Sequence, residues 1–165
     1  MSESFDMPEV THFVCGTVGP PGQRVFHLQV EAEGRLVSFR AEKQQVAILC
    51  DYLERILATH DVPEGPPAHM RELVEPVLDE WIVGSMMVAI NEAAGRVIVI
   101  AEEMVPDDDE DDPEVEPAQA RFGMTRSQVE AFIDGARRVV EGGRPICRLC
   151  GRPMDSTGHP CPRLN

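Results

Sequence analysis

Hydrophobic and polar residues alternate along the first part of the chain, which is the pattern of half-buried β-strands. Between Val25 and Glu31 every second side chain is apolar, and a strand of this kind buries one face only. Glu33-Gly34 then predicts a tight hairpin turn, with residues 36–41 as the partner strand. We expect a shorter strand at 12–15 and a connecting loop over 16–22.

The spacing of apolar residues changes from two to three and four after Glu42. An apolar stripe at this spacing runs from Val46 to Leu57 and indicates an amphipathic helix that ends near His60. The prolines of segment 63–67 stop this helix. A short helix over His69–Glu75 is expected to follow, because Pro76 ends it.

The second part of the chain predicts further strands and a second helix. Strands are expected at Trp81–Asn91, at Val97–Glu102 and at Gln119–Gly123, the first two joined by a turn at Ala94-Gly95. Thr125-x-x-Gln128 is a capping box, and it predicts a helix over residues 126–141 that Gly142-Gly143 ends.

The same order of hairpin and helix recurs in two halves of the chain, residues 11–60 and residues 80–142. The two helix stripes also match position for position, although any two amphipathic helices share this spacing. The simplest interpretation is an α+β fold of two ββα-like halves, in which both main helices pack on a mixed or antiparallel sheet.

Residues 86–90 and 97–101 are apolar at nearly every position. Strands without a polar face are typically covered on both sides. Two helices need not cover both faces of one sheet, so two arrangements satisfy the pattern. Either the sheet curls on itself, or a second subunit caps it and the protein is a homodimer.

The formal net charge of −14 changes the range of expected partners. A chain this acidic repels phosphate backbones, so nucleic-acid binding by residues 1–143 is not expected. Ten acidic residues fall within 102–116, and Asp107–Asp112 is unbroken. This run lacks the glycine and the spacing of a calcium loop, so we interpret residues 105–117 as a solvated loop.

No targeting or membrane-spanning segment is expected in this sequence. Residues 1–8 lack the basic and apolar regions of a signal peptide, and no apolar run approaches the length of a membrane span. The chain has five cysteines. Reduced thiols in the cytoplasm, with one metal site, explain this count better than disulfides do.

The strongest chemical signal lies in the tail, residues 144–165. Two cysteines stand three positions apart and a His-x-Cys pair follows, which completes a four-ligand set: Cys147, Cys150, His159 and Cys161. Cys₃His is a typical tetrahedral zinc site, and four protein ligands leave no position for a reacting water. We therefore predict one structural zinc ion. Iron fits the same ligands, and free thiols or a redox Cys-x-x-Cys pair are the alternatives.

The remaining candidates for chemistry give weaker signals. The glycine-rich loop Gly16–Arg24 could hold an anion on its amides, but it opens no helix, so a hairpin connection is the favoured interpretation. His27 lies on the polar face of its strand and is expected to be exposed. No nucleophile, base or nucleotide motif is found, which favours a protein that is not an enzyme.

Several of these motifs together resemble a known family. They are Gly16-Thr17-Val18-Gly19 with Pro21–Arg24, the helix start Glu42–Val46, Val83–Met86, and the tail Cys147–Pro153 with Gly158–Arg163. The chain is similar in these residues to an actinobacterial family catalogued as domain of unknown function 3090. The resemblance spans essentially the whole chain. It implies a cytoplasmic bacterial protein with a zinc-ribbon-like tail, and it implies no particular activity.

The first loop and the first helix start are joined by one hairpin, so they could form a single surface. We expect this surface to bind a partner through Gly19, Gly22, Gln23, Arg24, Glu42, Lys43 and Gln44. The sequence thus favours a non-enzymatic interaction or adaptor protein with an unidentified protein partner. The alternative is a small-ligand-binding protein or enzyme that uses the Gly16–Arg24 loop.

Overall fold

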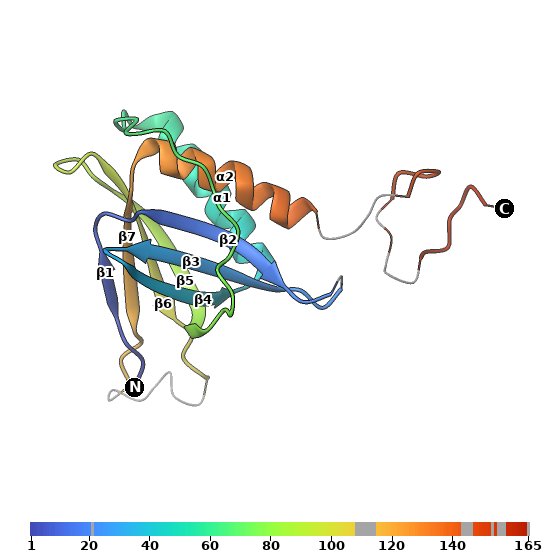
Figure 1. The fold of residues 1–165 in the computed structure, drawn as a ribbon, viewed down its shortest axis with the longest axis horizontal. Coiled ribbons are helices and arrows are strands. Elements are labelled where there is room, and N and C mark those ends of the chain that lie inside the picture. Colours follow the sequence, from blue (N-terminus) through green and yellow to red (C-terminus); the bar gives the residue numbers. More distant parts are fainter. Residues whose placement is uncertain (21, 108–114, 143–146, 153, 155–157, 165) are drawn as a thin grey trace.

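The computed structural model describes residues 1–20, 22–107, 115–142, 147–152, 154 and 158–164. Within them the chain forms seven strands and two helices (Figure 1). They are β1 (Phe5–Met7), β2 (His12–Val18), β3 (Val25–Ala32), β4 (Arg35–Ala41), α1 (Lys43–Thr59), β5 (Asp79–Asn91), β6 (Arg96–Glu103), β7 (Gln119–Met124) and α2 (Arg126–Glu141).

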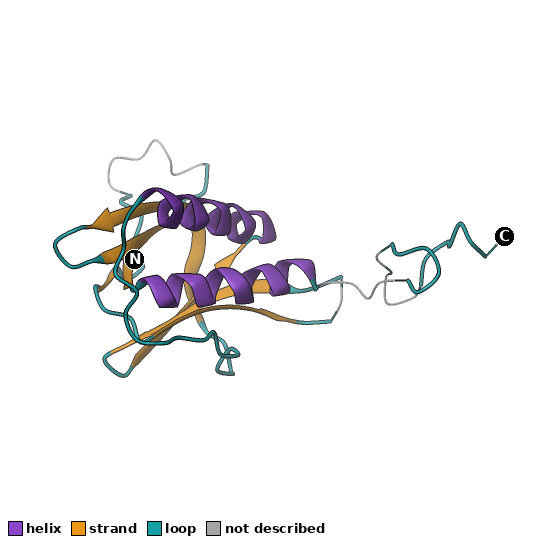
Figure 2. Cartoon of the chain, turned by 90° about the horizontal axis from the view of Figure 1, so that it is seen from above, coloured by secondary structure: helices purple, strands orange, loops and turns teal. Residues whose placement is uncertain are grey.

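The seven strands form one mixed sheet in the order β1-β7-β6-β5-β4-β3-β2. Neighbouring strands are antiparallel except for β1 with β7 and β4 with β5. Helices α1 and α2 lie side by side over the sheet (Figure 2). The predicted α+β class, a mixed sheet packed by two main helices, is confirmed.

Aromatic contacts show that the sheet curls on itself. Phe13 of β2 and Phe122 of β7 have ring centroids 5.6 Å apart, although four strands lie between β2 and β7 in the order of the sheet. Phe132 of α2 packs 4.6 Å from Phe13 and joins the same core. The sheet therefore curls as one of the two expected arrangements requires, and its inner face and the helices share one core. The other arrangement, a homodimer, stays a prediction.

The chain itself does not cover both faces of β5 at Met87. This side chain is 58% exposed and points away from the core, whereas Met86 and Val88 are half-buried against it. In β6 the inward residues Val97 and Val99 are fully buried. Ile98, which lies between them and faces outward, is also buried, although less completely. The convex face of β5 is thus exposed at Met87 in the single chain, and its cover by a second subunit stays a prediction.

The β3–β4 hairpin has the turn that the sequence predicts. The register pairs Ala32 with Arg35, which leaves the two residues Glu33 and Gly34 as the loop. Both have positive φ, 52° and 77°, as the two central residues of a type I′ turn require. Glycine meets this demand without strain at the second position.

Each main helix begins with a capping box. In α2 the Thr125 side chain accepts the Gln128 amide, and the Gln128 side chain returns to the Thr125 N–H, as predicted. Helix α1 has an equivalent box formed by Glu42 and Gln45, which the sequence analysis missed because Glu is an unusual N-cap residue. Both boxes satisfy amides that the first turn leaves unpaired. His60 ends α1, and its N–H donates to Ile56 O at 3.0 Å.

Segment 61–78, here called the strap, crosses the outer face of β2, β3 and β4 (Figure 1). The short helix predicted at His69–Glu75 is absent from it. The buried Gln29 side chain instead holds the strap backbone: its Nε2 donates to Val74 O at 3.0 Å, and its Oε1 accepts the Val74 N–H at 2.8 Å. Long-range bonds therefore replace the local bonds of a helix.

The strap also explains why His27 is buried, contrary to the expectation that it is exposed. Its side chain lies beneath the strap, with Nδ1 2.8 Å from Asp79 Oδ1 at the start of β5. Leu73 packs on Gly16, where a Cβ would lie only 2.5 Å from Leu73 Cγ. The polar face of β3 is thus an internal surface between two layers of chain.

Strand β1 was not expected, and some expectations lie outside the described residues. β1 pairs with β7 through only three residues, Phe5–Met7, and so short a run carries no periodic signal. Most of the acidic run, residues 108–114, and Gly143 of the predicted helix stop are not described. Among the described helices, none is long and apolar enough to cross a membrane.

Candidate metal centre

The four predicted ligands come together in the tail. One side-chain atom from each of Cys147, Cys150, His159 and Cys161 lies within 4.8 Å of all the others. The sulfurs of Cys147 and Cys161 are 3.9 Å apart, and Cys150 Sγ is 3.1 Å from His159 Nε2. A tetrahedral zinc ion sets ligand atoms roughly 3.8 Å (S–S) or 3.6 Å (S–N) apart. The cluster can therefore hold a metal ion with little rearrangement.

Two tight turns position the cysteines. The first runs from Cys147 to Gly151, whose N–H donates to Cys147 O at 2.8 Å. Gly151 has φ of 71°, a left-handed conformation that favours glycine. The second turn starts at Cys161, where the Leu164 N–H donates to Cys161 O at 3.1 Å. Each turn aims one buried sulfur into the cluster.

Backbone amides tune the two buried thiols. Hydrogen bonds from the Cys150 and Leu149 amides lower the pKa of Cys147. At Cys161 the Arg163 amide acts in the same sense, but burial and the nearby Cys150 and Cys147 sulfurs outweigh it and raise the pKa. Several thiolates at this separation need a counter-charge, and a bound cation supplies one. The donor set and its amides thus suit a thiophilic metal ion.

The cysteines of the body contrast with those of the tail. Cys15 in β2 and Cys50 in α1 are both buried in the core. Burial raises the pKa of Cys15 to about 12 and that of Cys50 to about 11. Both thiols therefore stay protonated at neutral pH, and they behave as small apolar side chains rather than as ligands or nucleophiles.

The predicted binding surface lies where β3 begins and β4 ends, at the start of α1. Gly19, Gly22 and Gln23 are exposed in the β2–β3 hairpin loop, which confirms the hairpin interpretation of residues 16–24. Gly19 and Gly22 have φ of 111° and 86° and form the bend. Glu42, Lys43 and Gln44 are exposed at the start of α1. The last pair in the β3–β4 register is Phe26 with Ala41, so the two segments leave adjacent strands at the same end.

Two residues of this surface have structural roles that the sequence did not reveal. Arg24 is half-buried, and its guanidinium donates to Gly142 O at the end of α2, at 3.4 Å. Glu42 caps α1. Arg24 is the one member of the seven that is not exposed. That the seven residues bind a partner stays a prediction.

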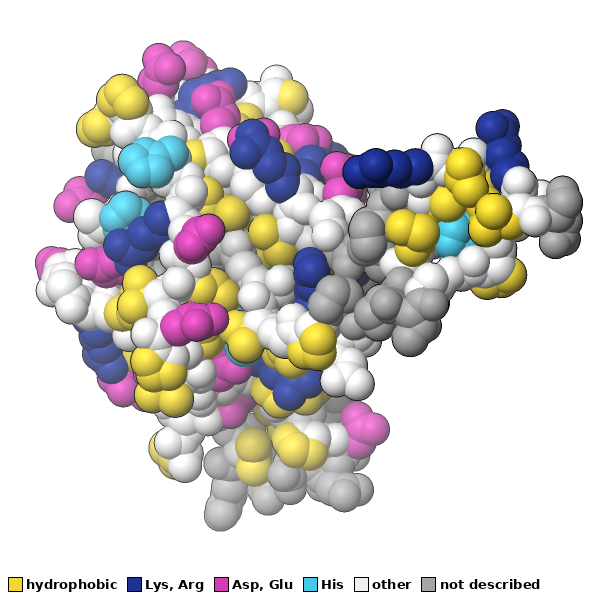
Figure 3. Space-filling model, turned by 45° about the vertical axis from the view of Figure 1, so that its right-hand side comes forward, with side chains coloured by type: hydrophobic (Ala, Val, Ile, Leu, Met, Phe, Trp, Pro, Cys, Tyr) yellow, Lys and Arg dark blue, Asp and Glu magenta, His cyan; other side chains and the backbone are white. Residues whose placement is uncertain are grey.

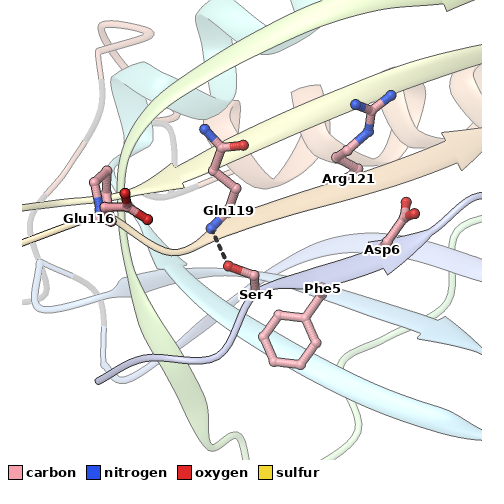
Figure 4. Close-up of a pocket in the computed structure, with 7 residues that line it drawn as sticks. Ser4, Phe5, Asp6, Glu116, Gln119 and Arg121 are labelled. Carbon is pink, nitrogen blue, oxygen red and sulfur yellow. Dashed lines mark hydrogen bonds between the residues drawn. The ribbon is translucent and has the colours of Figure 1, made fainter.

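A separate, open pocket of about 560 Å³ lies at the edge of the sheet beside β1 (Figure 4). Asp6 of β1 and Arg121 of β7 are paired in the strand register, and Ser4 Oγ accepts the Gln119 amide at 3.0 Å. The sequence analysis missed this site because it depends on the unexpected pairing of β1. Its charged side chains are all exposed, so the pocket is a surface hollow and not an enclosed binding site.

Comparison with known proteins identifies the family. A family model described as "Protein of unknown function (DUF3090)" matches residues 4–161, which include the whole sheet, both helices and all four candidate ligands. No curated protein and no solved structure matches the chain significantly. The resemblance noted from the sequence motifs is thus confirmed, and the chain belongs to the DUF3090 family.

Proposed function

We propose that the tail binds one structural zinc ion and that the protein acts as a non-enzymatic interaction protein. The observation that carries the zinc site is the convergence of four ligand atoms within 4.8 Å. Cys147 and Cys161 contribute the buried sulfurs, and Cys150 and His159 the half-buried ligand atoms. Three thiolates and one imidazole form a donor set that zinc prefers.

The ligand count supports a structural role. Four protein ligands complete a tetrahedral shell and leave no position at which the metal could bind substrate or activate water. A thiol redox pair would need only Cys147 and Cys150, and it would not require His159 and Cys161 at the same point. The joint placement of all four therefore favours metal binding over redox chemistry.

The body supplies little that favours catalysis. The buried His27 imidazole pairs with the partly exposed carboxylate of Asp79, which joins β3 to the start of β5. Arg24, the charged residue of the glycine-rich loop, bonds to the end of α2. Neither group meets an exposed nucleophile among the described residues, so we assign both to the structure of the body.

Metal analysis of the purified full-length chain tests this proposal. We expect one zinc ion per chain by native mass spectrometry and by elemental analysis, with no iron. Cys147→Ser should lose the metal, while the matched control Cys50→Ala, which removes a thiol from the core, should retain it. A metal-free wild-type chain, iron in place of zinc, or full zinc in Cys147→Ser would contradict the proposed site.

A further inference from the structure

An arginine followed by a leucine occurs twice in the tail, once in each turn that carries a candidate cysteine ligand. The first turn has Arg148-Leu149 and the second has Arg163-Leu164. Leu149 is 50% exposed and Leu164 is 71% exposed. All four side chains are exposed, and none of them belongs to the set of four candidate ligands.

The metal cluster holds these two pairs close to one another. Arg148-Leu149 begins one residue after Cys147, and Arg163-Leu164 begins two residues after Cys161. The sulfurs of these two cysteines are 3.9 Å apart. In the right-hand lobe of Figure 3, hydrophobic side chains gather around the histidine, and Lys or Arg side chains lie beside them. The tail thus carries exposed leucines and exposed arginines on the two turns that the cluster joins.

The charge of the tail is opposite to that of the whole chain. Residues 147–165 carry three arginines, Arg148, Arg152 and Arg163, and one aspartate, which gives a net charge of +2, against −14 for the protein. All three arginines are exposed. Guanidinium groups bind carboxylates through paired hydrogen bonds, and exposed leucines favour an apolar partner surface.

We infer that Arg148, Leu149, Arg163 and Leu164 form a docking face for an acidic protein segment that also carries apolar side chains. This inference rests on the proposed zinc site, because the metal fixes the two turns that present the face. Nucleic acid is a poorer fit. Residues 147–165 contain no Phe, Tyr or Trp on which bases could stack, and the acidic body repels phosphates.

Binding of short labelled probes to the full chain tests the inference by fluorescence anisotropy. The probes are a peptide of Glu and Leu, a peptide of Glu and Ser, a peptide of Lys and Leu, and a single-stranded oligonucleotide. We expect the Glu/Leu peptide to bind at least roughly tenfold more tightly than each of the others, since both charge and apolar contact contribute. Added salt should weaken this binding.

Two double variants then locate the binding. Arg148→Glu with Arg163→Glu should reduce affinity for the Glu/Leu peptide by at least roughly tenfold, and Leu149→Ser with Leu164→Ser should remove the preference over Glu/Ser. Arg40→Glu with Arg55→Glu makes the same charge change on the body, at two exposed positions, and should leave most of the affinity.

The metal content of every variant separates the two claims. If the wild-type chain holds no zinc, the proposed function fails and this inference fails with it. If zinc is present but the Glu/Leu peptide shows no preference, or the oligonucleotide binds more tightly, only the docking face is overturned. Equal loss of affinity in the Arg40/Arg55 control would also overturn it, because the effect would then come from net charge alone.

Discussion

The body and the tail of this protein achieve order by different means. The body buries a continuous apolar core from β1 to α2, in which Phe39, Phe122 and Phe132 are fully buried. In the described part of the tail, residues 147–152, 154 and 158–164, the only buried side chains are Cys147 and Cys161. A segment with so little apolar burial needs another source of stability, and a bound metal ion can supply it.

The cysteines of the two regions also differ, in the pKa values of their thiols. In the body, burial keeps the Cys15 and Cys50 thiols protonated through raised pKa values. In the tail, the Cys150 and Leu149 amides lower the pKa of Cys147 and favour the thiolate that a metal needs. Cysteine is thus core material in the body and a candidate metal ligand in the tail.

Removal of one candidate ligand is expected to have the largest effect, a loss of zinc affinity that is confined to the tail. Structural zinc sites contribute about 10–16 kcal/mol, so His159→Ala should weaken zinc binding by several orders of magnitude in competition with a chromogenic chelator. His69→Ala, at an exposed histidine of the body, is the matched control and should bind as wild type. Equal zinc affinity in the two variants would show that His159 is not a ligand.

Truncation of a core aromatic should have a large effect in the body alone. Phe39 is fully buried and lies 4.4 Å from the ring of Trp81 and 5.6 Å from that of Phe122. Phe39→Ala should lower the free energy of unfolding by about 3–5 kcal/mol. Denaturant unfolding followed by fluorescence of Trp81, the single tryptophan, measures this change.

Zinc binding by the same variants shows whether the tail depends on the core of the body. Folded Phe39→Ala should still bind one zinc ion, and Phe39→Leu should show a smaller loss of stability with the same metal content. If loss of core packing also abolished zinc binding in folded protein, the two regions would not be independent.

A smaller effect is expected where the strap meets β3. Gln29→Leu leaves the Val74 N–H and C=O without the partners that Gln29 provides, which should cost about 1–3 kcal/mol. Trypsin should also cleave the strap at Arg71 faster in this variant, because the strap opens more often. Gln44→Leu, at an exposed position of α1, should change neither rate nor stability; no difference between the two variants would contradict this role of Gln29.

The smallest expected effect is at the cap of α2. Thr125→Ala removes the side-chain acceptor of the Gln128 amide and should destabilise the body by about 0.5–2 kcal/mol. Thr125→Ser keeps an acceptor and should lose much less. Thermal unfolding of the two variants checks this order, and a reversed order would mean that the methyl group of Thr125 matters more than its oxygen.

The sequence was most informative where local rules determine the structure. The stripes of α1 and α2, the Thr125 capping box and the Glu33-Gly34 turn all depend on residues close in the chain, and each was predicted correctly. The convergence of the four candidate ligands belongs to the same class, because their spacing alone places them around two turns.

The features that the sequence did not reveal depend on distant partners. Strand β1 exists because it pairs with β7, more than a hundred residues later. The strap is ordered by Gln29, and His27 is buried because the strap covers it. Alternation correctly predicted which face of β3 is polar, but it cannot show that a later segment returns to cover that face.

The most direct test of the account is an amide NMR spectrum of the full chain before and after removal of metal by a chelator. We predict that signals of residues 147–164 lose dispersion, that those of β1 to α2 stay unchanged, and that added zinc restores the first spectrum. Loss of dispersion throughout the body, or a tail that stays ordered without metal, would contradict the claim that a metal ion orders the tail and a hydrophobic core orders the body.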